Sequence, residues 1–324
     1  MKLQLLVPQY HETDAEVKPL LDSVAIQQGI DLSEVGVVIV NDGSDVKLSH
    51  DFLKSYPFKI EYYDAPHQGV SATRNECLDH ATAEYVMFCD ADDMFYNACG
   101  MWILFREFQI GNFDSMISVF VEELKDRNTG QLTYINHDMD LTFVHGKVYR
   151  RQYLIDNHIR FNPALTIHED SYFNCLAQKC GNTPKYCQTP FYLWKWRDTS
   201  VCRHDPKYIL KTYNNMLESS TALVNEFLRR SRKGDARYFA TGMIYDSYFT
   251  MNKKEWIDQE NKQYRDATEK RFQKYYYDFK DLFDEVPEQE KTQIVSGIRN
   301  RMYQEGLLME SITFDDWIKH IETL

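Results

Sequence analysis

The sequence predicts an α/β protein in which helices flank a mostly parallel sheet and a helical appendage follows at the C-terminal end. Up to about Phe120, short runs of β-branched and apolar residues alternate with stretches whose apolar residues recur at helical spacing. This alternation is typical of parallel β-α units. After Asp205, Gly and Pro become scarce and apolar residues fall at helical intervals, which predicts a run of helices. We therefore expect domains at 1–204 and 205–324.

The individual elements can be followed in order along the chain. Leu3 to Val7 is a strand candidate, and a helix follows, with Thr13 or Asp14 as its N-cap. The continuous β-branched run from Val35 to Val40 fits a strand covered on both faces. The same reasoning predicts strands at 58–63 and 85–89, a helix at 69–80, a hairpin of 115–123 with 131–135, and helices near 150–158 and 170–180.

The net charge and the N-terminal sequence limit which binding partners and which cellular compartment we expect. The formal net charge is −12 and the sequence pI is near 5.3, which opposes general binding to phosphate polymers or anionic lipid. The apolar run that ends at Pro8 is too short for a leader peptide or a membrane span. We therefore expect a cytoplasmic protein with no transmembrane segment, and a peripheral association with the membrane is left open.

The cysteines favour reduced thiols. They number seven, are dispersed, and include no C-x-x-C pair, so neither a disulfide scaffold nor a standard zinc site is indicated. A zinc site built from the last four cysteines with His168 or His204 is the minor alternative.

Three predicted strands end in polar or acidic turns, at 8–11, 41–44 and 90–93. Because the carboxyl ends of parallel strands line one crevice, a ligand site is expected there. The run from Asp90 to Asp93 holds three carboxylates in four residues, and such a cluster needs a cation or solvent to be tolerated. Mg²⁺ or Mn²⁺ beside a diphosphate meets that need, although a solvated acidic turn is the simpler alternative. Asp42 can bind a base or ribose, or be only part of an Asp-Gly turn.

Taken together, these segments resemble the family 2 glycosyltransferases, which have the Rossmann-like GT-A fold. The likeness covers residues 3 to about 203 and rests on six segments in the family's order. They are Val7-Pro8-x-Tyr10, Val40-Asn41-Asp42-Gly43-Ser44, Gly69-Val70-Ser71-Ala72-x-Arg74-Asn75, Phe88-Cys89-Asp90-Ala91-Asp92-Asp93, His145-Gly146-Lys147-Val148-Tyr149-Arg150 and Glu169-Asp170-Ser171-Tyr172-Phe173.

The resemblance implies a role for each matching residue. Asp170 is the implied general base, with Glu169 beside it, and Asp92 is the implied metal ligand, with Asp93 less certain. The implied nucleotide and donor contacts are Pro8, Tyr10, Asp42, Arg74, Asp90 and Arg197. The acceptor-side segment contributes His145 and Lys147, and Trp194 belongs to a tryptophan-rich segment near the donor. A carboxylate at 170 suits an inverting transfer, in which it takes the proton of the acceptor hydroxyl.

The function expected from the resemblance is a single sugar addition from a nucleoside diphosphate sugar, with UDP as the expected nucleotide, to a hydroxyl of a glycan or lipid-linked acceptor. The chain lacks the Gln-x-x-Arg-Trp motif of the family's processive synthases. Two alternatives stay open. One is transfer to a modified base in DNA, which only the basic cluster at 229–237 supports. The other is a catalytically inactive protein that binds sugar nucleotides or glycans.

Past residue 205 the sequence resembles nothing that reveals a role. We interpret the basic cluster at 229–237 as a solvated helix end, since Gly234 lies within it. We interpret the aromatic residues around Tyr275 to Tyr277 as a packed stripe. Homo-oligomerisation through these helices remains open.

Overall fold

The computed structural model describes the chain except for residues 112, 183, 199, 201–204, 206 and 305–311. It divides into two compact units, Met1–Ser200 and Val201–Leu324. Residue 204, where the sequence predicts a domain boundary, lies outside the described residues, as do Cys202 and His204 of the zinc alternative. The described cysteines are free thiols. Among the described residues, every helix is too short or too polar to cross a membrane.

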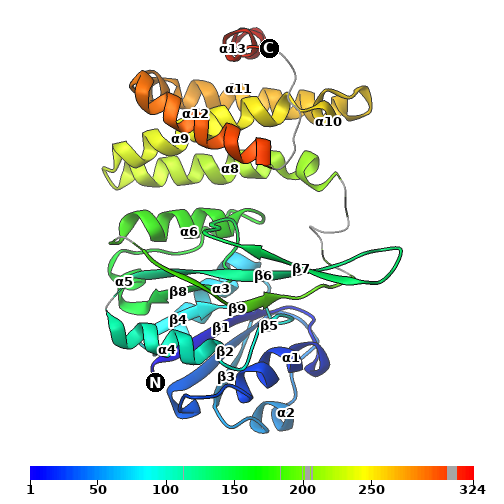
Figure 1. Ribbon diagram of the computed structural model, residues 1–324, viewed down its shortest axis with the longest axis vertical. Helices are drawn as coiled ribbons and strands as arrows, with labels where there is room; N and C mark the ends of the chain where they lie inside the picture. The colour runs from blue at the N-terminus through cyan, green and yellow to red at the C-terminus, as the bar shows by residue number, and fades with distance from the viewer. Residues whose placement is uncertain (112, 183, 199, 201–204, 206, 305–311) are drawn as a thin grey trace. The chain divides into compact units, whose positions relative to one another are not determined.

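The first four strands form the parallel half of the sheet in Figure 1. β1 (Leu3–Gln9) lies between β2 (Val35–Asp42) and β4 (Tyr85–Phe88), and β3 (Lys59–Ala65) pairs with the outer side of β2. All eight residues of β2 are buried, as its β-branched run predicts. In this register the carboxyl ends of β1, β2 and β4 reach the same edge of the sheet, so the polar turns that follow them meet there.

The second half of the sheet is mixed. β8 (Lys147–Arg150) pairs antiparallel with β4 and with β6 (Ser115–Lys125), and β9 (Lys185–Trp194) runs parallel to β6. β5 (Met94–Phe95) completes this edge, while β7 (Leu132–His137) forms the predicted hairpin with β6. The described residues thus confirm an α/β fold in which the β1–β4 half is parallel and later strands add antiparallel pairings.

Helices connect the strands and cover the sheet. α1 (Asp14–Ala25) starts at Thr13, which forms a capping box with Glu16. α3 (Val70–His80) packs on β1 and β2, and α4 (Gly100–Ile110) contacts β9. The remaining helices of this unit are η1 (Leu32–Glu34), α2 (His50–Lys54), α5 (Arg151–Asp156) and α6 (Glu169–Cys180).

The second unit consists of helices. Their bounds are α8 (Tyr208–Arg229), α9 (Lys233–Met251), α10 (Lys254–Ile257), η2 (Gln259–Asn261), α11 (Lys262–Asp284), α12 (Glu288–Gln304) and α13 (Phe314–Glu322). α8, α9 and α11 pack against one another. The predicted aromatic stripe is largely internal, because Phe272, Tyr275, Tyr276 and Phe279 are buried. These rings therefore stabilise the bundle rather than present a sugar-binding surface.

Candidate active site

The acid cluster that follows β4 lies at the carboxyl edge of the parallel strands. Asp93 is only 1% exposed, and both of its carboxylate oxygens accept hydrogen bonds, from the Tyr192 hydroxyl at 2.5 Å and from the Lys195 backbone N–H at 3.0 Å. One ligand atom each from Asp90, Asp93 and His145 lies within 4.8 Å of the other two. The structure therefore brings a residue from the acceptor-side segment to the acid cluster.

Burial and mutual repulsion make this cluster electrostatically costly. Burial, together with the charges of Asp92 and Asp90, raises the pKa of Asp93 well above its usual range. Burial and Asp90 also raise the pKa of Asp92. Burial acts in the same direction on Asp90, but Arg74 and His145 outweigh it and hold the pKa of Asp90 below its ordinary value. An added cation would favour the ionised form of all three carboxyl groups.

Arg74 joins the acid cluster to the proposed base. Its guanidinium donates hydrogen bonds to Asp90 at 3.1 Å, to Glu169 at 2.9 Å and to Asp170 at 2.5 Å. The guanidinium lies on α3, Asp90 follows β4, and the other two carboxylates begin α6. The sequence resemblance implied a nucleotide contact for Arg74. Here the side chain is 5% exposed, and its two terminal nitrogens pair with three carboxylates, while its buried Nε has no hydrogen-bond partner among the described residues.

Asp170 occupies a position suited to proton transfer. It lies in the first turn of α6, just after His168, whose backbone is left-handed with a φ of 62°. Its second oxygen accepts the Val144 backbone N–H at 3.2 Å. Burial raises the pKa of Asp170 to about 8, with the charges of Glu169 and Asp90 acting in the same direction and Arg74 opposing them. A general base works best when its pKa lies near the operating pH.

Asp92 points to a different partner. The Arg197 guanidinium donates to Asp92 at 2.9 Å and to Glu12 at 3.3 Å, and it lies 3.7 Å from Glu16. Asp92 and Arg197 also line a cavity of about 310 Å³ with residues of α1 and of the segment after β9. The positive charge of Arg197 therefore balances the negative charge of Asp92. Glu12, which the sequence analysis did not predict as a site residue, contacts the same guanidinium.

The predicted nucleobase end lies at the tips of β1 and β2. The Asp42 carboxylate accepts the backbone N–H groups of Gln68 at 2.8 Å and Gly69 at 3.0 Å, so it fixes the start of α3. Tyr10 is 45% exposed and stacks on His67 with 4.8 Å between ring centroids. Pro8 lies in β1 opposite Val40. Tyr10, His67 and His11 thus form a group of exposed aromatic side chains at this end, with 4.1 Å between the ring centroids of Tyr10 and His11.

His67 and Tyr192 are two further site residues that sequence reasoning missed. The His67 ring nitrogen lies 3.0 Å from an Asp42 oxygen, but a histidine in a polar loop carries no local signal of that contact. Tyr192 lies in β9 and reaches Asp93 across the sheet, and its segment was not predicted as a strand. Both contacts join residues that are far apart in the sequence, so local sequence patterns do not reveal them.

Lys147, His145 and Trp194 form the wall next to the acid cluster. Burial lowers the pKa of Lys147 to about 8, and its ammonium donates to the His145 carbonyl at 3.2 Å. The His145 ring stacks on Tyr192 with 5.1 Å between centroids and lies 5.1 Å from Trp194. This aromatic wall fixes the orientation of the imidazole.

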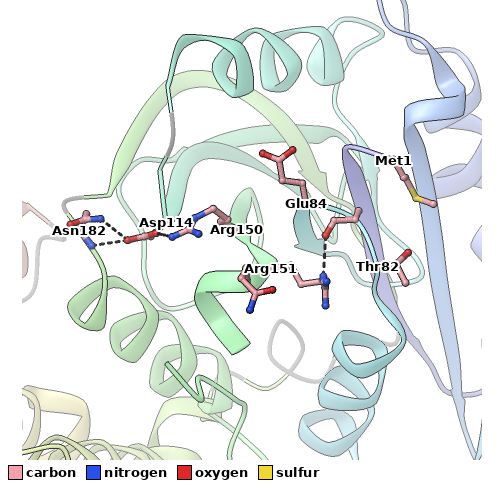
Figure 2. Close-up of a pocket in the computed structure, with 9 residues that line it drawn as sticks. Met1, Thr82, Glu84, Asp114, Arg150, Arg151 and Asn182 are labelled. Atoms are coloured by element: carbon pink, nitrogen blue, oxygen red, sulfur yellow. Dashed lines mark hydrogen bonds and ion pairs between the residues drawn. The ribbon is translucent and has the colours of Figure 1, made fainter. Parts of the chain in front are cut away.

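A larger cavity of about 730 Å³ lies elsewhere in this unit, as Figure 2 shows. It is lined by residues that directly precede β4, such as Glu84, and by Arg150 at the end of β8. Asp114 accepts hydrogen bonds from Arg150 and Asn182 along one side of it. Because Glu84 and Asp90 flank opposite ends of β4, this cavity is remote from the acid cluster.

The residues of the acid cluster fit a divalent cation. Ligand atoms of Asp90, Asp93 and His145 lie within 4.8 Å of one another, which is close enough to bind one ion. Carboxylate oxygens are the ligands that Mg²⁺ and Mn²⁺ prefer. Burial first, and the neighbouring carboxylates second, raise the pKa of Asp92 and Asp93. The residues present are therefore compatible with the metal predicted from the sequence.

Comparison with known proteins identifies glycosyltransferases as the relatives of this chain. Residues 5–163 match the family described as Glycosyl transferase family 2. Glycosyltransferase YibD of Escherichia coli is 25% identical over 230 residues, which cover 62% of this chain and 63% of YibD. Poly(ribitol-phosphate) beta-N-acetylglucosaminyltransferase TarS of Staphylococcus aureus is 25% identical over 194 residues, which cover 56% of this chain and 33% of TarS. Both matches span less than two thirds of the relative.

Solved structures show the same architecture. The crystal structure of TarS residues 1–349 superposes with a TM-score of 0.62 at 17% identity, covering 94% of this chain and 92% of that one. Fold and site thus define a glycosyltransferase domain with a GT-A-like fold, as predicted. More specifically, residues 5–163 match Glycosyl transferase family 2, and this match covers just under half of the chain.

Proposed function

We propose that this protein is an inverting glycosyltransferase that moves one sugar from a nucleoside diphosphate sugar, with UDP as the nucleotide, to a hydroxyl of a glycan or lipid-linked acceptor. The observation that carries the proposal is the single Arg74 guanidinium that holds both Asp90 and Asp170. Since the donor-side acid and the base share one partner, a sugar bound beside Arg74 is within reach of both.

Mn²⁺ or Mg²⁺ is the proposed cofactor. Asp92 is the proposed ligand from the sequence resemblance, and Asp90, Asp93 and His145 are the candidates from geometry. Such a cation would neutralise the developing charge of the diphosphate leaving group. Arg197, which pairs with Asp92 in this structure, is the proposed second positive charge for the diphosphate.

Asp170 is the proposed base. The acceptor oxygen attacks the anomeric carbon and forms the new glycosidic bond, while the bond from that carbon to the diphosphate oxygen breaks. The carboxylate takes the proton from the acceptor hydroxyl, and the nucleoside diphosphate leaves with the electron pair. Arg74 and the Val144 backbone N–H orient the carboxylate for this step.

Related proteins support the donor and the acceptor class. The TarS fragment has been solved with UDP and with UDP-GlcNAc, and a mannosyltransferase from Pyrobaculum calidifontis with GDP-Man and Mn²⁺. The name of TarS includes a poly(ribitol-phosphate) acceptor. A phosphate-containing glycan is therefore included in the proposed acceptor class.

The structure offers the DNA alternative little support. Within the basic cluster at 229–237, Arg229 and Arg230 both bond Glu226, and Arg232 bonds Asp235. Lys233 and Arg237 lie within 3.7 Å of Glu285 and Glu290 respectively. Locally balanced cations release few counterions on binding nucleic acid, so they add little affinity.

Thermal shift assays with UDP and GDP, each with and without Mn²⁺, test the proposal, because a ligand of the folded state raises the melting midpoint. We expect UDP to stabilise the protein, more strongly with Mn²⁺. Mass spectrometry of products from a panel of nucleotide sugars then tests transfer, with Asp170→Asn as the inactive comparison. Unchanged turnover in Asp170→Asn would falsify the base assignment. Ligand binding without any transfer would favour the inactive binding protein.

A further inference from the structure

The group of ligand atoms in the acid cluster omits the acid that the sequence resemblance implies as a metal ligand. Asp92 is that implied ligand. Among the described residues, however, the ligand atoms within 4.8 Å of one another come from Asp90, Asp93 and His145. Asp92 lies in the same turn, but its Oδ2 atom accepts a hydrogen bond from the Arg197 guanidinium at 2.9 Å. Arg197 therefore occupies the carboxylate that a cation would need.

A metal ion on Asp92 has to compete with Arg197. The side chains of Arg197 and Asp92 are 34% and 20% exposed, so solvent screens this ion pair less than a pair on the open surface. A divalent ion on the same oxygen binds at about 2.1 Å, which places it within about 5 Å of the guanidinium nitrogen. Two positive charges at that separation repel each other in a partly buried site. Binding of a metal to Asp92 thus requires the guanidinium to move away.

Arg197 can leave Asp92 and still keep acidic partners. Its guanidinium lies 3.3 Å from Glu12 and 3.7 Å from Glu16. The Glu12 carboxylate is itself held by the Tyr10 backbone N–H at 2.7 Å. A cavity of about 310 Å³ adjoins Arg197 and Asp92, so the guanidinium has room to turn. Release from Asp92 therefore costs one ion pair rather than the whole charge balance of Arg197.

We infer that Arg197 couples metal binding to diphosphate binding. Before ligands bind, its guanidinium takes the place of a cation on Asp92. When a metal takes Asp92, the guanidinium is released, and the diphosphate of the donor accepts its charge. The diphosphate half of this inference rests on the proposed function, whereas the competition between Arg197 and a metal does not.

The coupling has a thermodynamic consequence. A metal that binds alone must displace Arg197 without supplying an anion to receive it, so we expect it to bind weakly. A diphosphate that binds alone must likewise draw Arg197 away from Asp92 and leave that carboxylate without its cation. Each ligand therefore favours the released state of Arg197, and each raises the affinity of the other by the same factor.

The test measures metal binding rather than transfer. Mn²⁺ is titrated calorimetrically into the full chain at about pH 8 and about 100 mM salt, with and without saturating UDP. The proteins are the wild type, Arg197→Gln, Asp92→Asn and the double variant of these two. Arg160→Gln is the matched control, because Arg160 pairs with Asp79 at the C-terminal end of α3. Melting curves without ligand show that each variant is folded.

Without UDP, Arg197→Gln should bind Mn²⁺ roughly tenfold more tightly than the wild type, because a neighbouring charge shifts the equilibrium of a carboxylate by about that factor or more. Arg160→Gln should change the affinity by less than about twofold. In the Asp92→Asn background the gain from Arg197→Gln should disappear, since the two residues act through one contact. Unchanged Mn²⁺ affinity in Arg197→Gln, or a gain that persists in the double variant, overturns the inference.

The titrations with UDP test the second half. UDP should tighten Mn²⁺ binding to the wild type, and this enhancement should be roughly tenfold smaller in Arg197→Gln, which has no guanidinium to release. Absence of any enhancement in the wild type, or equal enhancement in both proteins, overturns the coupling. If neither UDP nor GDP binds, the proposed function and the coupling to a diphosphate are both rejected. The titrations with Mn²⁺ alone still decide whether Arg197 competes for Asp92.

Discussion

Replacing Asp170 with Asn should stabilise the folded protein while abolishing transfer. Burial raises the pKa of this carboxyl to about 8 in the folded state, whereas in the unfolded chain it is about 3.9. Below pH 4 both states hold the proton. Between pH 4 and pH 8 the unfolded state releases it and the folded state retains it, so the free energy of unfolding falls as the pH rises.

The size of this effect follows from the pKa difference. At pH 7 the solution is about three pH units above the pKa of Asp170 in the unfolded chain and still below its pKa in the folded state. Keeping the folded carboxyl protonated at this pH costs about 4 kcal/mol of stability. Asn removes that cost, but Arg74 exchanges its 2.5 Å hydrogen bond to the Asp170 carboxyl group for one to an amide oxygen, which offsets about half of the gain. We expect a net stabilisation of about 2 kcal/mol at pH 7, or roughly 4–8 °C in Tm.

The assay is a series of melting curves from pH 4 to pH 9 for wild type and Asp170→Asn, with product formation measured on the same samples. The Tm difference should be smallest near pH 4, grow with pH, and level off above pH 8. Asp156→Asn, a carboxylate at the end of α5, serves as a control for removing one negative charge. A Tm difference that is independent of pH, or a variant less stable than wild type at pH 8, refutes the reasoning.

Three further predictions concern the same site. Arg74→Met should lower the Tm by roughly 6–20 °C at pH 7, because it leaves three buried carboxylates without their shared cation; a shift below about 2 °C contradicts this. Asp92→Asn should weaken the Mn²⁺-dependent part of UDP binding by about tenfold or more, measured by calorimetry with and without the metal; equal metal dependence in both proteins argues against Asp92 as a ligand. Tyr10→Ala should weaken UDP binding by roughly 1–3 kcal/mol through lost stacking, and His67→Ala should change it measurably; affinities equal to wild type in both variants exclude this aromatic pair from the nucleotide site.

Sequence patterns predicted those elements whose signal is local. The β-branched run of β2, the capping box at Thr13 and the hairpin of β6 with β7 each depend on neighbouring residues. The sequence analysis did not predict the strands β8 and β9 or the helix α4. β8 has only four residues, and β9 contains Pro190, so pairing with distant strands rather than local preference decides their conformation.

The candidate site divides in the same way. Motif order predicted Asp90, Asp92 and Asp170 as residues of one site, and this remains a prediction. It did not reveal that Arg197 balances Asp92, that Tyr192 holds Asp93, or that Asp42 is bonded to backbone N–H groups. Each of these contacts joins residues more than 20 positions apart.

The sequence by itself predicted the fold class, because strand periodicity and turn chemistry act over a few residues. Its resemblance to the family 2 glycosyltransferases predicted the enzyme class and the acidic residues of the candidate site. Only the tertiary structure decided which charge faces which. Arg74 on α3 meets carboxylates from β4 and α6, and that meeting depends on sheet register. The pKa of Asp170 likewise follows from burial and from charges distant in sequence, since Coulomb interactions depend on separation in space rather than along the chain.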